Sequence, residues 1–265
     1  MRVGRNLTWQ ASRGNNCGVT ATLDRTAYLS HFRADADALA AAGERGRDSP
    51  IPSCPEWKMG DLLTHTGMVH RWAAAIVRGG LLERPPFKAY VAPDGVDLVA
   101  WYRASAADVA DALAEADPDR PMYNFTGATQ TAAFWVRRQA QEVSIHRWDA
   151  EAAVGSARPI NALLAADGVD EQLAMLGFAV RSTKPDLSLG GSLHLHATDA
   201  DGEWMIGIEN GQMTIKHGHG KGDAAVRGPA GTLNLAMWGR VSLADEPGFE
   251  RFGDASVISA FSGAL

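Results

Sequence analysis

Apolar residues recur at three- and four-residue steps along the first two thirds of the chain, which is the period of an amphipathic helix. This pattern predicts helices over about 23–43, 59–78, 96–116, 130–153 and 160–180. Segments rich in proline, glycine and charged residues separate these stretches. The pattern therefore predicts an all-helical region that extends to about residue 182.

The pattern changes after Pro185, where strand-like segments replace the helical period. Asn210 and Gly211 form the strongest two-residue signal for a β-hairpin. The predicted elements are strand-like segments over 187–189, 192–198, 203–209 and 213–215 and helices over 231–238 and 256–265. The expected fold class is thus α + (α+β), with a helical region followed by a smaller mixed one.

These patterns divide the chain into three parts. Residues 1–18 lack periodicity and are expected to form a loose N-terminal leader. Residues 19–182 are expected to form a helical domain, and residues 183–265 an α+β domain. Translation from Met1 and translation from a start near Val19 are both compatible with the sequence.

The composition is that of a globular protein. Hydrophobic residues make up 46% of the 265 residues and charged residues 21%, so the chain can bury a sizeable core. The net charge of −6 at pH 7 argues against a non-specific nucleic-acid binder, which needs a basic face. The same charge gives no general attraction to anionic membranes.

Three further observations predict a cytoplasmic protein. The chain contains no apolar run long enough to span a bilayer, and residues 1–18 contain no apolar core of a secretory signal. The two cysteines, Cys17 and Cys54, form neither a CxxC motif nor a disulfide framework, which fits a reducing compartment. The oligomeric state cannot be derived from the sequence.

Three residues on two predicted helices form a candidate metal site. Glu142 and His146 are four residues apart, which places both side chains on one helix face. His65 lies among apolar residues of another helix and is expected to point inward. Two histidines and one carboxylate leave one coordination position open, as in catalytic zinc sites. Two plainer interpretations stay open: an ordinary hydrogen bond between Glu142 and His146, and a core histidine at position 65.

Two groups of motifs contain these three residues. The first is PSCPEW at 52–57, followed by DLLTH at 61–65 and VHRW at 69–72. The second is RRQAQEVSIHRWDAE at 137–151. In sequence and separation they resemble the motifs of the mycothiol-dependent maleylpyruvate isomerase family. The resemblance covers about residues 20–180 and, more weakly, the C-terminal part.

The resemblance implies a fold, a metal and a reaction class. The implied fold is a DinB-like four-helix metal-binding bundle followed by a small α+β domain of the SCP2-like type. The implied ligands of a divalent metal, usually zinc, are His65, Glu142 and His146. The implied activity is that of an isomerase or S-transferase that uses mycothiol on a small electrophilic substrate, of which maleylpyruvate is the type compound.

One position departs from the family pattern. Many relatives carry histidine immediately before the metal-binding glutamate, where this chain has Gln141. Adjacent helix residues point about 100° apart, so Gln141 and Glu142 do not share a face. We therefore expect the three-ligand site to be retained. The replacement of histidine by Gln141 affects only the supporting or acid–base role that this position would have in relatives.

The proposed ligand set indicates how a thiol would be activated. A thiol must lose its proton to become a nucleophile, and contact with zinc can remove that proton. Neither Cys17 nor Cys54 is an obvious ligand, so the thiol would be a separate molecule such as mycothiol. In an isomerase the thiolate adds to a conjugated double bond, the resulting single bond rotates, and the thiol leaves. In a transferase the C–S bond is kept.

Two residues on the same helix as Glu142 are candidates for a catalytic role. Asp149 is three residues beyond His146 and could orient a metal ligand or the thiol, or form an ion pair with a basic neighbour. Arg138 lies one turn before Glu142 and could bind an anionic substrate. Equally, it could be an ordinary arginine exposed to solvent.

An arginine of the C-terminal region is a third catalytic candidate. The segments RGPA at 227–230 and MWGR at 237–240 resemble the C-terminal part of the family, which implies an arginine that reaches the active site. Arg240 is the first candidate and Arg227 the second, because a guanidinium group suits a dicarboxylate. Alternatively, Arg240 only follows a helix end, where the helix dipole favours a cation.

Four histidines in the C-terminal region form an alternative metal site. His194 and His196 share one face of a predicted strand, and His217 and His219 follow the predicted hairpin. A loop and a solvated strand face are the plainer interpretation of these residues.

A non-catalytic DinB-like module that binds a small molecule or a protein is the alternative to an enzyme. Such a module would be free to lose His65 or Glu142, and this chain keeps both. The sequence contains no P-loop, no dinucleotide-binding fingerprint after a strand and no nucleophile elbow.

Overall fold

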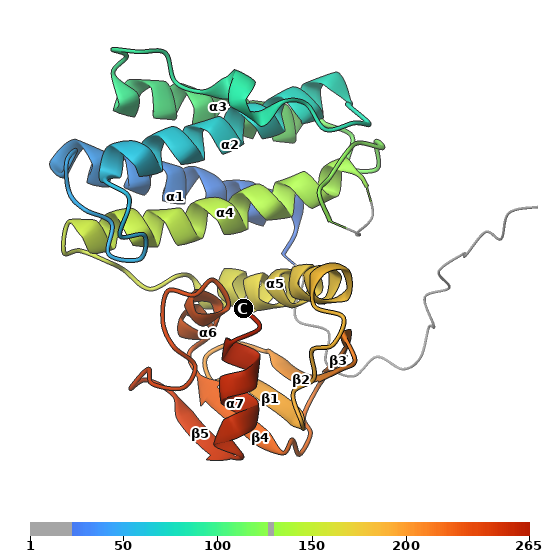
Figure 1. Ribbon diagram of the computed structural model, residues 1–265. Helices are drawn as coiled ribbons and strands as arrows, with labels where there is room; N and C mark the ends of the chain where they lie inside the picture. Colours follow the sequence, from blue (N-terminus) through green and yellow to red (C-terminus); the bar gives the residue numbers. More distant parts are fainter. Residues whose placement is uncertain (1–22, 127–129) are drawn as a thin grey trace, which may run out of the picture.

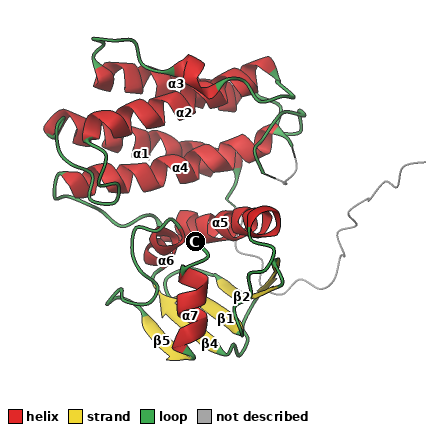
Figure 2. Cartoon of the chain, viewed as in Figure 1, coloured by secondary structure: helices red, strands yellow, loops and turns green. Residues whose placement is uncertain are grey.

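The computed structural model describes residues 23–126 and 130–265. Long helices make up the upper part of the molecule, and helices cover a small sheet in the lower part (Figure 1 and Figure 2). This arrangement confirms the predicted layout of a helical region followed by a small α+β region. The predicted leader at 1–18 and the alternative start at Val19 lie outside the described residues.

Four long helices form the upper layer and lie side by side (Figure 1). They are α1 (Arg25–Arg45), α2 (Met59–Gly79), α3 (Leu98–Glu115) and α4 (Ala132–Ala153). A short 3-10 turn, η1 (Phe87–Tyr90), lies in the connection between α2 and α3. Helix α1 packs most extensively on α4, and α2 on α3. All four begin and end within two residues of the predicted stretches, because their apolar faces carry the helical period.

The lower part contains three helices and a five-stranded sheet. The helices are α5 (Ala162–Thr183), α6 (Ala230–Met237) and α7 (Ala255–Ser262). The strands are β1 (Ser192–Ala197), β2 (Glu203–Glu209), β3 (Gln212–His217), β4 (Ala224–Gly228) and β5 (Glu250–Gly253). Their order in the sheet is β3-β2-β1-β4-β5. Among the described strands only β1 and β4 pair in parallel, and the other neighbours are antiparallel.

The predicted hairpin is confirmed, the segment expected at 187–189 is not a strand, and two strands were not predicted. Asn210 and Gly211 have φ angles of 48° and 70° and join β2 to β3, as the two-residue signal requires. Strands β4 and β5 are short, and β5 is mostly exposed. Neither strand is therefore long and apolar enough to show an alternating hydrophobic pattern in the sequence.

Helix α5 packs with the lower part of the molecule. It contacts α6 and β3 more extensively than α4. The indole of Trp204 on β2 donates a hydrogen bond to Asp170 on α5, with a nitrogen–oxygen distance of 2.7 Å. The sequence does not predict this packing, because the apolar face of α5 does not by itself specify its partner.

Polar side chains determine where several helices begin. Asp24, Asp97 and Asn161 each accept a hydrogen bond from a backbone N–H in the first turn of α1, α3 and α5. Such caps satisfy donors that have no partner within the helix. At the other end of α2, Gly80 adopts a left-handed conformation with φ of 57°, which favours glycine.

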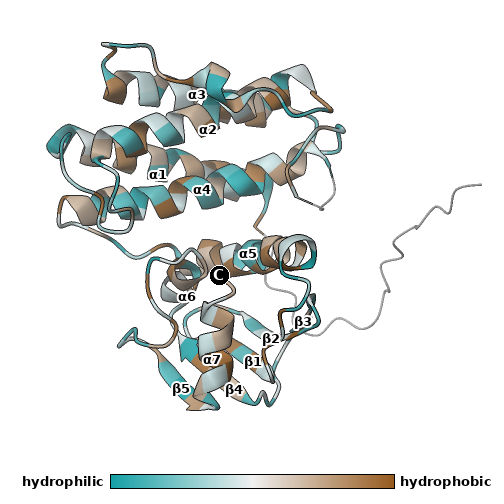
Figure 3. Cartoon of the chain, in the orientation of Figure 1, coloured by the Kyte–Doolittle hydropathy of each residue, from teal (hydrophilic) through white to brown (hydrophobic). Residues whose placement is uncertain are grey.

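Buried apolar side chains run through both parts of the molecule as one cluster. Trp135 and Tyr102 are fully buried in the upper layer, and Trp204 and Phe261 in the lower part. Hydrophobic and hydrophilic residues follow one another along the upper helices, as amphipathic helices require (Figure 3). Within the described residues, no helix combines the length and the apolar character needed to cross a membrane.

Candidate functional site

The structure brings His65 of α2 together with Glu142 and His146 of α4. Nε2 of His146 lies 3.2 Å from Oε1 of Glu142, and Nε2 of His65 lies 3.5 Å from the same oxygen. The three potential ligand atoms all lie within 4.8 Å of one another. Neighbouring ligands of a tetrahedral zinc ion with bonds of ~2.1 Å are ~3.4 Å apart. The donor types and their spacing therefore fit a divalent metal.

Asp149 orients the ring of His146. Its Oδ2 lies 3.0 Å from Nδ1 of His146 and accepts a hydrogen bond of 2.8 Å from Arg240. Burial favours a higher pKa for Asp149, but hydrogen bonds from His146 and Arg240 lower this pKa to about 2. Burial also disfavours charge on His146, but hydrogen bonds to Asp149 and Glu142 raise its pKa to about 9. A metal at Nε2 must therefore displace a proton at neutral pH.

Arg138 holds the other oxygen of Glu142. It donates to Oε2 of Glu142 at 2.8 Å and to Oε2 of Glu171 on α5 at 2.5 Å. Burial favours a higher pKa for Glu142, but hydrogen bonds from the two site histidines and the charge of Arg138 hold this pKa well below its ordinary value. The side chain of Arg138 is only 3% exposed, so the solvated position considered for it is wrong.

The ring of Trp238 lies close to both arginines of the site. The guanidinium of Arg138 lies 4.7 Å from the centroid of its ring, and that of Arg240 lies 5.7 Å away. Both distances permit a cation–π interaction. Trp238 directly follows α6, so the lower part of the molecule contributes both an aromatic platform and an arginine to the site.

The segment at 52–57 contacts the site from the loop before α2. Ser53 donates a hydrogen bond of 2.6 Å to Oδ1 of Asp149, and the ring centroids of Trp57 and His65 are 4.9 Å apart. The sequence predicted neither contact, although both residues belong to the first motif. Glu171 was not predicted either, because its position on a helix was the only sign of a contact with Arg138.

Gln141 and Arg227 are directed elsewhere. The amide of Gln141 donates to the carbonyl of Leu164 at 3.0 Å and to the carboxylate of Asp167 at 2.8 Å, both on α5. Gln141 thus points away from the ligands, as the helical angle between adjacent residues predicts. Arg227 on β4 faces Glu250 on β5 at 3.7 Å and is about half exposed.

The second predicted cluster differs by one member. The ligand atoms that meet within 4.8 Å belong to His194, His196, Glu203 and His219. His217 instead faces Asp170, at 2.6 Å. The inclusion of His217 was wrong, because β3 ends at this residue and Gly218, with φ of 103°, turns the chain before His219.

The fold and these contacts define a two-part protein with a candidate metal centre where a helical layer meets a small α+β region. Family models match both parts. The mycothiol maleylpyruvate isomerase N-terminal domain matches residues 28–151, and the MDMPI C-terminal domain matches residues 164–260. The chain belongs to the mycothiol-dependent maleylpyruvate isomerase family.

Two solved structures are similar over most of their length. The crystal structure of the mycothiol-dependent maleylpyruvate isomerase is 13% identical, with a TM-score of 0.62. A histidine-to-alanine mutant of that isomerase is 14% identical, with a TM-score of 0.56. In both cases the similarity covers 86% of this chain and 93% of the other. This similarity concerns the fold. No curated protein matches the sequence of this chain.

Proposed function

We propose that this chain is a metal-dependent enzyme that uses mycothiol, or a similar low-molecular-weight thiol. It would isomerise a small electrophilic substrate or transfer the thiol to it. The observation that carries the proposal is the convergence of His65, Glu142 and His146 in a member of this family. Three protein ligands are typical of catalytic zinc sites, in which a further molecule takes the fourth position.

The proposal includes a division of labour between two domains. Helices α1 to α4 would form the DinB-like four-helix bundle that holds the metal, and the lower part would be the SCP2-like domain. We place the boundary at 154–161, between α4 and α5, because α5 packs on α6 and β3. The end of one family match at residue 151 and the start of the next at residue 164 support this placement.

The residues around the ligands would prepare them for the metal. Asp149 accepts a hydrogen bond from Nδ1–H of His146, which would direct Nε2 toward the metal. Arg138 engages Oε2 of Glu142 and leaves Oε1 facing both histidines. The guanidinium groups of Arg138 and Arg240 are engaged with carboxylates of the chain, so we assign both as positioning residues. A bound divalent metal would lower the pKa of a coordinating thiol and so supply a thiolate at neutral pH.

A thiolate is the nucleophile that either reaction requires. In the isomerase reaction the thiol sulfur bonds to one carbon of a conjugated double bond, and the resulting single bond rotates. The same C–S bond then breaks, which restores the double bond and releases the thiol, so no net oxidation or reduction occurs. In the transferase reaction the C–S bond persists. The contacts of this site do not select one substrate among small electrophiles.

A turnover assay with mycothiol and a panel of electrophiles, maleylpyruvate included, tests the proposal. We expect turnover to require both thiol and metal, to be lost in chelator and to return with zinc. His65→Ala should lower both turnover and bound zinc, with turnover at least ~100-fold below that of the wild type, since one of three ligands is lost. His31→Ala, on the partly exposed surface of α1, is the matched control and should leave both unchanged.

Two results would contradict the proposal. Turnover that is unchanged in chelator would show that the metal does not activate the thiol. Zinc binding at His65 without turnover of any electrophile would favour the non-catalytic module instead.

A further inference from the structure

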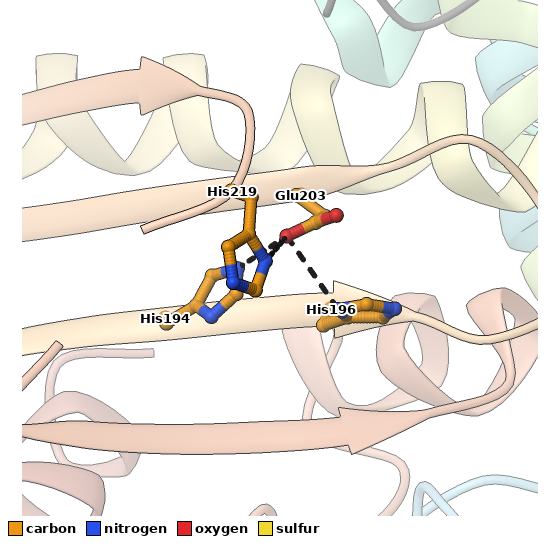
Figure 4. Close-up of side chains that lie close together, drawn as sticks. All are labelled: His194, His196, Glu203 and His219. Carbon is orange, nitrogen blue, oxygen red and sulfur yellow. Dashed lines mark hydrogen bonds and ion pairs between the residues drawn. The ribbon is translucent and has the colours of Figure 1, made fainter. Parts of the chain in front are cut away.

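A second cluster of potential ligands lies on the sheet, on elements other than α2 and α4. Figure 4 shows three imidazole rings around the carboxylate of Glu203. Oε2 of Glu203 lies 2.8 Å from Nδ1 of His219, 2.9 Å from Nε2 of His194 and 3.5 Å from Nδ1 of His196. A single oxygen on β2 thus faces three ring nitrogens, two from β1 and one from the segment after β3.

The pairing of β1 with β2 assembles most of this cluster. His196 lies directly opposite Glu203 in the antiparallel register, and His194 lies two residues earlier on the same face of β1. Trp204, the next residue after Glu203, points to the opposite face and donates to α5. The cluster therefore occupies the face of the sheet that is turned away from α5.

A turn after β3 brings the fourth member. The N–H of Gly218 donates to the carbonyl of Glu203 at 3.0 Å, and its φ of 103° is a conformation that favours glycine. The chain then places His219 over the sheet, although its side chain is 79% exposed. An exposed imidazole directed at a shared carboxylate indicates that the loop at 218–222 is arranged around this point.

Hydrogen bonding to Glu203 accounts for two of the three rings but not for the third. A carboxylate oxygen has about two lone-pair positions, so it can accept from two of the three rings. The distance to the third ring, that of His196, is 3.5 Å and too long for a good hydrogen bond. That distance is instead close to the ~3.4 Å between neighbouring ligands of a tetrahedral zinc ion. The other two separations, 2.8 and 2.9 Å, are hydrogen-bond distances that would lengthen when a metal replaces the shared protons. The ligand atoms of all four residues lie within 4.8 Å of one another, which leaves them within reach of one ion.

We propose that His194, His196, Glu203 and His219 bind a divalent transition metal, with zinc as the best match. Imidazole nitrogen is a ligand that zinc, copper and nickel accept, whereas calcium and magnesium require mostly oxygen ligands. Four protein ligands complete a tetrahedral shell, which is the closed arrangement of a structural site. The ion would fasten the loop at 218–222 to β1 and β2 and so stabilise the small domain.

Metal content of the full chain tests this site. The protein is stripped with chelator and equilibrated with zinc, free metal is removed, and bound zinc is measured by mass spectrometry. We expect His219→Ala and Glu203→Gln each to bind one zinc ion per chain fewer than the wild type. His217→Ala is the matched control, because His217 faces Asp170, and it should bind as much zinc as the wild type.

Hydrogen exchange supplies a readout of the structural role. Zinc should slow amide exchange at 218–222 in the wild type and in His217→Ala, but not in His219→Ala. Magnesium and calcium should give no protection. Because His219 is exposed, its replacement should leave the fold intact, which circular dichroism of the metal-free proteins verifies.

Equal zinc content in the wild type, His219→Ala and Glu203→Gln would overturn the proposal, whether or not the protein binds zinc elsewhere. Loss of zinc in His217→Ala would also overturn it. Each comparison keeps His65 unchanged, so these outcomes are independent of the ion proposed for the enzyme site.

Discussion

Arg240 and Asp149 form an ion pair that joins the two parts of the molecule. Nη2 of Arg240 donates to Oδ2 of Asp149 at 2.8 Å and Nε donates to Oδ1 at 3.2 Å. The carboxylate is completely buried, and the two residues are 91 positions apart in the sequence. Asp149 also contacts His146, so a residue of the lower part supports a candidate metal ligand of the upper layer.

This relationship predicts coupled effects on zinc affinity. Arg240→Ala and Asp149→Asn should each weaken zinc binding by about 10- to 100-fold, because a candidate ligand loses its supporting contacts. The double variant should lose little more, since both residues act through one contact. Competition with a chromophoric chelator measures the Kd. Arg227→Ala, which removes an arginine that faces Glu250, is the control and should retain wild-type affinity. Additive losses would contradict the coupling.

Arg138 should be essential for stability as well as for the site. Its guanidinium is the partner of two carboxylates, those of Glu142 and Glu171. Arg138→Met would leave both without this counter-charge and should lower the free energy of unfolding by about 3–5 kcal/mol. Adding Glu171→Gln should restore part of that loss, because one buried carboxylate is removed. Urea denaturation of chelator-treated proteins measures both effects, and wild-type stability of Arg138→Met would refute the prediction.

Close packing of α2 on α3 should make Gly67 intolerant of a methyl group. A Cβ atom at this position would overlap the indole of Trp101. Gly67→Ala should therefore lower the free energy of unfolding by about 1–3 kcal/mol, although alanine is the better helix former. At Gly60, also in α2, the nearest atom to an added Cβ is Cδ1 of Leu98 at 3.6 Å, an ordinary contact. Gly60→Ala is thus the control, and equal effects of the two variants in thermal melts would argue against the overlap.

Glu151 should contribute stability that depends on pH. Burial favours a higher pKa for Glu151, but hydrogen bonds from Arg158 and Arg147 hold this pKa below its ordinary value. A depressed pKa in the folded state stabilises the fold above the unfolded value of about 4.3, and this contribution is lost as the pH falls through the folded value. Glu151→Gln should therefore be less stable than the wild type at pH 7. The difference should shrink below about pH 4 in urea titrations, and a difference that is constant with pH would contradict this assignment.

The sequence predicted the upper layer well because its helices carry their own signals. Apolar residues recur with the helical period, and the structure confirms α1 to α4 within two residues of the expected bounds. The hairpin at Asn210 and Gly211 is equally local, since two residues define the turn. The three candidate ligands were identified from helical spacing and motif resemblance, and His65, Glu142 and His146 do lie together. Their role as ligands stays a prediction.

Other parts of the site depend on which elements pack together. The sequence could not show that Arg138 is shared by Glu142 and Glu171, because Glu171 lies on another helix whose partner was unknown. Nor could the sequence show that Glu203, and not His217, belongs to the second cluster. Membership depends on the strand register and on the turn at Gly218.

By itself, the sequence determined the helices, the hairpin and the identity of the site histidines and glutamate, because these follow from local period, turn chemistry and short motifs. Only the tertiary structure decided that α5 lies with the sheet, that Arg240 reaches Asp149, and that His219 meets Glu203. The physical reason is that such contacts join residues far apart in the chain. Their energies arise from packing and strand register, which no short segment encodes.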